Sequence, residues 1–277
     1  MSRPACLSVL VLLLSAPGAA AQGTIDWVNN YEEGMRQALE TNRAVMLDFW
    51  AAWCRPCVDM DREVYPVPAV AGMSRRFVFV RLDFDRQKDL ADRYRVYGIP
   101  MMVFTDPAGN ILASHVGYAS ASRLLGTMER IPESFEAVRA PMRVLAEDPS
   151  DFGALIQAAR FYLSKGLVLA AKDLYLRAGR TPAAHAGLPR DQVQMGLGVA
   201  ALTMKDGKEA EKIFQKALKQ CDPASREVLL LGLVRAHVQR SRAREAQAVA
   251  NELAQKHPGS PTAAKAREVV DTMQWNR

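Results

Sequence analysis

The chain has 277 residues, of which 49% are hydrophobic and 24% charged, and its formal net charge is +6. This composition excludes a disordered or low-complexity chain, and the length favours two domains over one. The basic residues are spread along expected helices without clustered aromatic side chains, which argues against a nucleic-acid partner and favours a solvated surface, with an acidic partner or a membrane surface as the alternative.

Residues 1–21 predict a cleaved secretory signal peptide. Arg3 gives a short positive start, residues 7–14 form an apolar segment, and small residues over 19–21 form a cleavage site. The apolar segment is too short to span a bilayer comfortably, so an uncleaved membrane anchor is the weaker alternative, and lipidation of Cys6 is another. We therefore expect an exported protein, located in the periplasm.

Residues 22–133 alternate helical and strand patterns and predict an α/β domain. In chain order, we expect a helix over 31–39, a strand over 45–51, a helix opening at Cys54, a strand over 77–83, a helix over 88–94, strands over 101–104 and 111–116 joined by a turn over 106–110, and a helix over 120–130. The run over 45–51 is almost wholly apolar, as in a central strand buried on both faces. The pattern predicts a mixed sheet with helices on both faces.

The tetrapeptide Cys54-Arg55-Pro56-Cys57 follows the strand over 45–51 and opens the next helix. Two thiols at this spacing can close into a small reversible disulfide, and the helix N-terminus lowers the pKa of the first thiol. A disulfide that closes so small a loop removes little entropy from the unfolded chain, so it would contribute little to stability. A zinc half-site is the alternative, but it needs two further ligands, and the four histidines are scattered. We expect a redox-active pair, no metal and no other cofactor, with Cys221 a half-buried free thiol.

Asp48 interrupts the apolar strand that leads to the two cysteines. A buried, unpaired carboxylate is costly, so we expect its pKa to be raised. A raised pKa suits a general base that works near neutral pH. The alternative is a side chain that points to a loop, which the flanking apolar residues disfavour.

Residues 134–277 predict an all-α domain of repeated helical hairpins. A pattern of small residues begins at Ala171, Ala210 and Ala246, with spacings of 39 and 36 residues, near the 34 residues of tetratricopeptide repeats, which this half resembles. We expect partner helices over 154–164, 192–204 and 226–239, and a capping helix over 261–274. The insertion over 180–190 disturbs the first period, so an irregular helical bundle is the alternative.

The segment over 48–57, followed by Gly98-Ile99-Pro100 and Gly117, resembles the thioredoxin superfamily. More narrowly, residues 27–131 resemble exported thioredoxin-like domains, including the soluble disulfide-reducing domain of bacterial electron-relay proteins. The resemblance implies the α/β thioredoxin fold.

The resemblance also implies the roles of the residues in and beneath the Cys-x-x-Cys motif. In this family the first cysteine, here Cys54, is the nucleophile, and the second, Cys57, resolves the mixed disulfide. A carboxylate at the position of Asp48 accepts and donates protons through water. Arg81 stands where thioredoxins often carry lysine, and arginine cannot accept a proton, so a lysine-assisted transfer is not expected.

Further residues around the motif are expected to bind substrate or to tune the thiols. By resemblance, Pro100 is a cis-proline, and the backbone of Ile99 pairs with an extended substrate strand. Trp53 is expected to form part of the apolar contact surface. Arg55 and Pro56 replace the common Gly-Pro, and a positive side chain there favours the thiolate.

We therefore expect an exported thiol–disulfide oxidoreductase that reduces or exchanges protein disulfides. Its partners would be disulfide-containing proteins, a membrane or soluble dithiol that donates electrons, and a protein bound by the helical repeats. The alternatives are a tetratricopeptide scaffold or adaptor with a secondary redox site, and an oxidase, since the same residues serve either direction.

Overall fold

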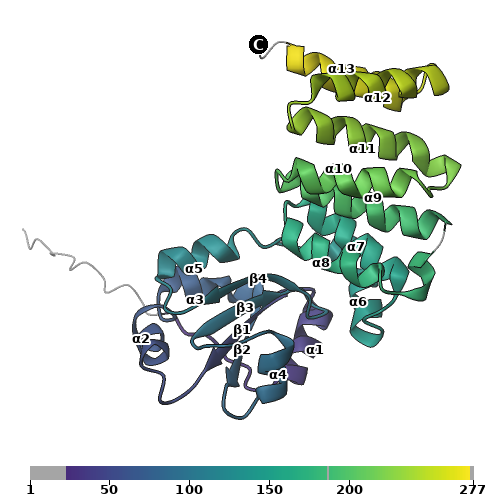
Figure 1. The fold of residues 1–277 in the computed structure, drawn as a ribbon. Coiled ribbons are helices and arrows are strands. Elements are labelled where there is room, and N and C mark those ends of the chain that lie inside the picture. The colour runs from purple at the N-terminus through teal and green to yellow at the C-terminus, as the bar shows by residue number, and fades with distance from the viewer. Residues whose placement is uncertain (1–22, 186, 275–277) are drawn as a thin grey trace, which may run out of the picture.

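The computed structural model describes residues 23–185 and 187–274 and shows an α/β part followed by a stack of helices (Figure 1). The α/β part consists of α1 (Tyr31–Thr41), β1 (Ala44–Trp50), α2 (Arg55–Glu63), α3 (Pro68–Ala71), β2 (Phe77–Asp83), α4 (Lys88–Arg93), β3 (Met101–Thr105), β4 (Ile111–Val116) and α5 (Ala121–Met128). The helical part consists of α6 (Arg139–Glu147), α7 (Phe152–Ser164), α8 (Val168–Ala178), α9 (Gly187–Thr203), α10 (Gly207–Leu218), α11 (Arg226–Gln239), α12 (Ala243–Lys256) and α13 (Pro261–Gln274). The expected signal peptide lies outside the described residues. Within the described ranges, every helix is too short or too polar to span a bilayer.

The four strands form one mixed sheet in the order β2-β1-β3-β4. β1 is parallel to β2 and antiparallel to β3, and β3 is antiparallel to β4. β1 is therefore central, and its C-terminal end leads directly into α2. The predicted mixed sheet with flanking helices is confirmed.

Both faces of β1 are covered, which explains its apolar sequence. Val45, Leu47 and Phe49 pack into a cluster with residues of α4, while Met46 packs on the opposite face with Met60 of α2. Because side chains alternate along a strand, Asp48 lies on the same face as Met46, beneath α2. The polar residue in the strand is thus placed under the cysteine motif by the register of the strand itself.

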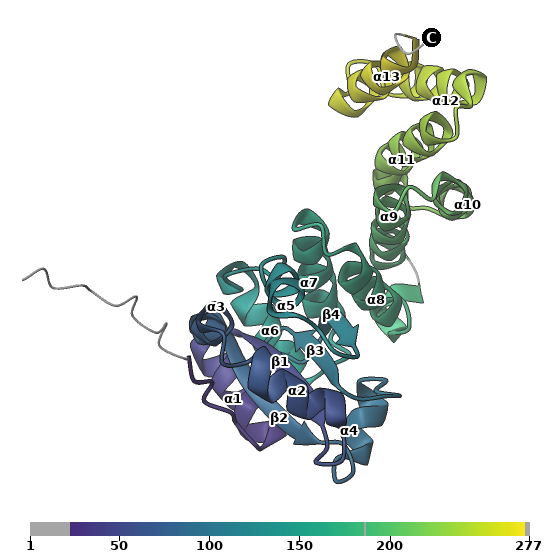
Figure 2. The same ribbon diagram turned by 90° about the vertical axis from the view of Figure 1, so that its left-hand side faces the viewer.

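The helical part is an antiparallel stack that leads away from the sheet, as Figure 2 shows from a second side. Its hairpins close tightly because glycines face aromatic rings. A Cβ atom added to Gly198 or Gly232 would lie 2.4 Å or 2.5 Å from the ring of Phe214, which is fully buried. The predicted all-α, tetratricopeptide-like part is confirmed.

Three helices differ from the sequence prediction. α3 and α6 are not expected from the sequence, since α3 has only four residues and α6 carries Pro141 in its first turn. α9 begins at Gly187, ahead of the expected start at 192, so most of the insertion over 180–190 is helical.

The hydrophobic core continues from the α/β part into the first helices of the stack. Met128 of α5, Phe135 and Tyr162 of α7 belong to one buried cluster, and the rings of Phe135 and Tyr162 meet edge to face at 6.5 Å. The boundary placed between residues 133 and 134 stays a prediction. What the structure shows is that the two parts share packed side chains on both sides of that boundary.

Candidate active site

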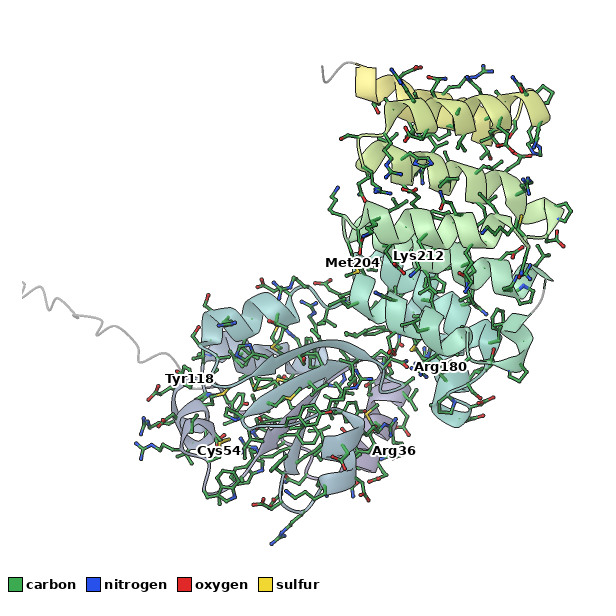
Figure 3. All side chains as sticks on the ribbon, viewed as in Figure 1. Arg36, Cys54, Tyr118, Arg180, Met204 and Lys212 are labelled. Carbon is green, nitrogen blue, oxygen red and sulfur yellow. A yellow bond between two sulfur atoms is a disulfide. The ribbon has the colours of Figure 1, made fainter. Side chains whose placement is uncertain are left out.

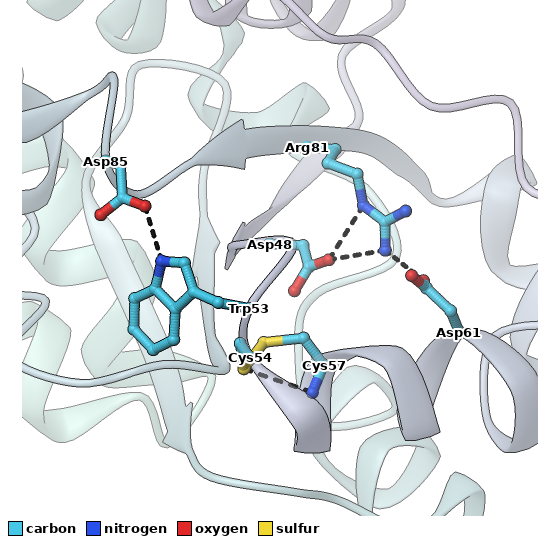
Figure 4. The surroundings of a disulfide bond; sticks show 7 residues. All are labelled: Asp48, Trp53, Cys54, Cys57, Asp61, Arg81 and Asp85. Carbon is cyan, nitrogen blue, oxygen red and sulfur yellow. Dashed lines mark hydrogen bonds and ion pairs between the residues drawn. A yellow bond between two sulfur atoms is a disulfide. The ribbon is translucent and has the colours of Figure 1, made fainter.

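The two cysteines lie where β1 ends and α2 begins, and they form a disulfide in this structure (Figure 4). Their Cα atoms are 5.3 Å apart. Cys54 is the residue that caps α2: its sulfur accepts a hydrogen bond from the Cys57 N–H at 3.3 Å, and Pro56 sits in the first turn, where a missing N–H costs nothing. In the reduced state this position places the Cys54 sulfur at the positive end of the helix dipole.

Both cysteines are buried, and each is only 3% exposed in the disulfide form. The reason is that Ala51, Trp50 and Ile99 pack against the sulfur pair. Neither cysteine is therefore freely exposed to solvent in the oxidised protein.

Exposed aromatic side chains surround the motif. Trp53 is 67% exposed, and its indole N–H donates to Asp85 at 2.7 Å. Tyr97, just before Gly98-Ile99-Pro100, is 85% exposed, and Tyr118 is exposed and donates to Glu63 of α2 at 3.3 Å. Sequence reasoning identified Trp53 and missed both tyrosines, although each directly neighbours a motif residue.

The Ile99–Pro100 peptide bond is cis. Ile99 packs against the sulfur pair, and the carbonyl oxygen of Pro100 accepts a hydrogen bond from Gly117 N–H at 2.8 Å. Two segments of the proposed thioredoxin motif, distant in sequence, therefore meet beside the cysteines.

Asp48 is buried beneath the motif and forms an ion pair with Arg81. Its Oδ2 atom lies 3.1 Å from Nη2 of Arg81, and its Oδ1 atom has no hydrogen-bond partner among the described residues. Burial raises the pKa of Asp48 to about 6, against the opposing effect of the positive Arg81. The carboxyl can therefore change its protonation state near neutral pH, with Oδ1 free to take part in the exchange.

Arg81 is held in place by three aromatic rings and a second carboxylate. Its guanidinium carbon lies 4.4 Å from the ring centre of Trp27, 4.8 Å from that of Trp50 and 5.7 Å from that of Tyr65, and it also pairs with Asp61 of α2. Such contacts favour a cation in a partly desolvated site.

Sequence reasoning identified Arg81 but missed its surroundings. Trp27 precedes α1, whereas Asp61 and Tyr65 lie in α2 and just after its end, so no local pattern connects all three with Arg81 in β2. The three residues belong to the site only through the fold.

Arg55, expected to tune the thiols, points into solvent. Its side chain is mostly exposed and lies 3.4 Å from Asp59, so its charge is partly balanced by a carboxylate one turn along α2.

Among the described residues, no cluster of histidine, cysteine and carboxylate side chains is arranged to hold a metal ion. The free cysteine, Cys221, is partly buried and lies in the helical part.

Comparison with known proteins separates the two parts of the chain. Residues 31–132 match the family model of a thioredoxin-like domain, and residues 201–268 match that of a tetratricopeptide repeat. The thiol:disulfide interchange protein DsbD of Vibrio vulnificus is 31% identical over 113 residues, which is 38% of this chain and 19% of that protein. Thioredoxin H5 of Arabidopsis thaliana is 32% identical over 92 residues, which is 32% of this chain and 72% of that protein.

A solved thioredoxin of Thermus thermophilus is 29% identical, with a TM-score of 0.36, over 38% of this chain and 85% of that one. The matches to DsbD cover less than a fifth of the relative's length.

Proposed function

This chain belongs to the thioredoxin family, and we propose that it is an exported thiol–disulfide oxidoreductase that reduces or exchanges disulfides in other proteins. The observation that carries the proposal is the Cys54–Cys57 pair at the start of α2, with the buried Asp48 beneath it. A scaffold would not require a buried carboxylate under two thiols.

The reaction begins with the reduced protein. The Cys54 thiolate attacks one sulfur of a substrate disulfide, so that a mixed disulfide forms and one substrate thiolate leaves and takes up a proton. Asp48 accepts the proton of the Cys57 thiol, and the Cys57 sulfur attacks Cys54. The Cys54–Cys57 disulfide closes, the second substrate thiolate leaves and is protonated, and the substrate has gained two electrons.

An external dithiol must return those two electrons to the protein after each cycle. We propose that a membrane or soluble dithiol donor does so, and that the helical repeats recruit a client or this donor. Support for recruitment comes from the match to tetratricopeptide repeats and from the packing of the repeats onto the α/β part.

The proposal is tested by the reduction of insulin disulfides in the presence of dithiothreitol. The wild-type protein should accelerate precipitation of the insulin B chain, and Cys54→Ser should abolish the acceleration. Without dithiothreitol, reduced Cys57→Ser should accumulate a mixed disulfide with insulin. In the assay with dithiothreitol, the matched control Cys221→Ser should keep full activity. Wild-type turnover no faster than dithiothreitol alone would favour the scaffold alternative.

The export proposal is supported by the sequence of residues 1–21 and has its own test. When the full chain is expressed in a bacterium with an outer membrane, we expect the protein in the periplasmic fraction, with Gln22 as its first residue. Retention in the cytoplasm with Met1 intact would contradict export.

A further inference from the structure

A cleft lies between the sheet and the first repeat helices, away from the cysteines. It encloses about 1000 Å³. One wall is formed by the end of α4, the turn over 106–110 and β4, and the other by α8 and the residues after it. β1 runs towards Cys54 and β3 runs away from it, so the turn that follows β3 is at the opposite end of the sheet from the disulfide. Figure 3 shows Arg180, in this cleft, well away from Cys54.

The cleft is lined by an excess of arginines. Arg93, Arg95, Arg177 and Arg180 line it, and Asp173 is the one acidic side chain among its lining residues. Arg95 and Arg180 are exposed and form no ion pair with any described residue. The cleft therefore presents uncompensated positive charge from both of its walls.

Two of these arginines are positioned by their neighbours. The guanidinium carbon of Arg93 lies 5.5 Å and 5.6 Å from the ring centres of Tyr94 and Tyr31. Arg177 donates to Oδ1 of Asn110 in the turn and to the carbonyl oxygen of Pro149. These contacts hold Arg93 and Arg177 in place, so their positive charge adds to that of Arg95 and Arg180 at the cleft.

A buried network fixes the two walls relative to each other. Asp106 is fully buried in the turn and accepts hydrogen bonds from the hydroxyl of Tyr162 at 2.5 Å and from Nδ2 of Asn110 at 2.7 Å. Tyr162 belongs to α7, which packs against α8, so this carboxylate ties the turn to the helical hairpin that carries the second wall. The cleft is therefore formed before any ligand binds.

The cleft also offers features that suit a polypeptide. Leu169 on α8 is 70% exposed, and Ile111 at the start of β4, which lines the same cleft, is 39% exposed. β4 is one of the two edge strands of the sheet. Because Gly117 N–H bonds to Pro100 and bonded pairs alternate along an antiparallel ladder, the backbone N–H and C=O of Ser114 face away from β3. A small anion would use the arginines but neither the apolar side chain nor the strand edge.

We propose that this cleft binds an extended, acidic polypeptide segment of a partner protein. Carboxylates of the segment pair with Arg95 and Arg180, an apolar side chain covers Leu169, and the backbone meets the free edge of β4 at Ser114. The site is separate from the redox centre and does not depend on its chemistry.

The test uses the full-length oxidised protein and a fluorescein-labelled ten-residue peptide of alternating glutamate and valine, followed by fluorescence anisotropy. We expect binding that weakens with salt, and a Kd at least about tenfold higher for the double variant Arg95→Glu/Arg180→Glu, equivalent to about 1.4 kcal/mol. The matched control Arg75→Glu/Lys208→Glu carries the same charge change, one substitution on each part, and should shift the Kd less than about twofold. Leu169→Asp should also weaken binding about tenfold, and circular dichroism and insulin reduction report that each variant is folded.

Three results would overturn the proposal. The first is no binding of the peptide at low salt. The second is equal weakening by the two double variants, which would assign the attraction to overall charge. The third is tighter binding of inorganic tripolyphosphate than of the peptide, measured by calorimetry and lost in Arg95→Glu/Arg180→Glu, which would make the occupant a small anion.

Discussion

Replacing Asp48 by asparagine should stabilise the folded protein at alkaline pH. In the fold, burial raises the pKa of this carboxyl from 3.8 to about 6. A group that binds its proton more tightly in the folded than in the unfolded state makes the free energy of unfolding fall as the pH rises between the two pKa values. The wild type therefore loses stability between about pH 4 and pH 6, and the loss is complete above that window.

The magnitude follows from the same two values. At 1.36 kcal/mol per pH unit, the difference between 3.8 and about 6 corresponds to about 3 kcal/mol. Asp48→Asn removes the titration and keeps an oxygen that can accept from Arg81, which retains Asp61 as its counter-ion. The free energy of unfolding of the variant minus that of wild type should therefore be about 3 kcal/mol larger at pH 8 than at pH 3.5.

Urea unfolding of the oxidised protein measures this difference. Tryptophan fluorescence reports on the α/β part, because Trp27, Trp50 and Trp53 lie there and only Trp275 lies beyond it. The measurement at pH 3.5, where the carboxyl is mostly protonated in both states, serves as the internal reference. A stability difference that is constant with pH, or a variant that loses stability relative to wild type as the pH rises, would refute the assignment of Asp48 as a buried, destabilising carboxyl.

Three further predictions follow from single contacts. Arg81→Leu removes the charge that opposes the raised pKa of Asp48, so the pH midpoint of insulin reduction should move up by about 1 to 3 units; an unchanged midpoint would contradict the role of the ion pair. Tyr97→Ala removes a side chain that is 85% exposed, so its unfolding free energy should stay within about 0.5 kcal/mol of wild type while the KM for insulin rises and the rate with a small aromatic disulfide is kept; an equal loss on both substrates would exclude a docking role. Tyr162→Phe leaves Asp106 with one donor fewer and should cost about 1.5 to 3 kcal/mol in urea unfolding, whereas Tyr97→Phe, made at an exposed hydroxyl, should cost almost nothing.

The sequence predicts most of the sheet and the cysteine motif because each depends on residues that are close together in the chain. Apolar runs mark β1 and β2, and Cys54 and Cys57 stand at the junction of a strand and a helix. The raised pKa of Asp48 could also be expected, since a single carboxyl in an apolar strand has no neighbour in sequence to pair with.

Other features of the site could not be predicted, because they depend on contacts between segments that are distant in the sequence. The aromatic rings around Arg81 come from the residues before α1, from β1 and from the end of α2. The burial of Cys54 depends on Ile99, which lies far along the chain. In the fold, helix α6 was not predicted because Pro141 suggests the end of a helix, although proline is tolerated in the first turn of one.

The bond between Asp106 and Tyr162 decides how a captured protein would meet the sulfur pair. A flexible tether would let any cargo search for the disulfide, with an effective concentration set by tether length. Here the buried carboxylate and the shared core hold the helical stack at one distance and one angle from Cys54. A protein bound by the outer helices could then bring one of its disulfides to Cys54 only if its own loops span this fixed distance. Selection among client proteins would therefore depend on their shape as much as on their affinity.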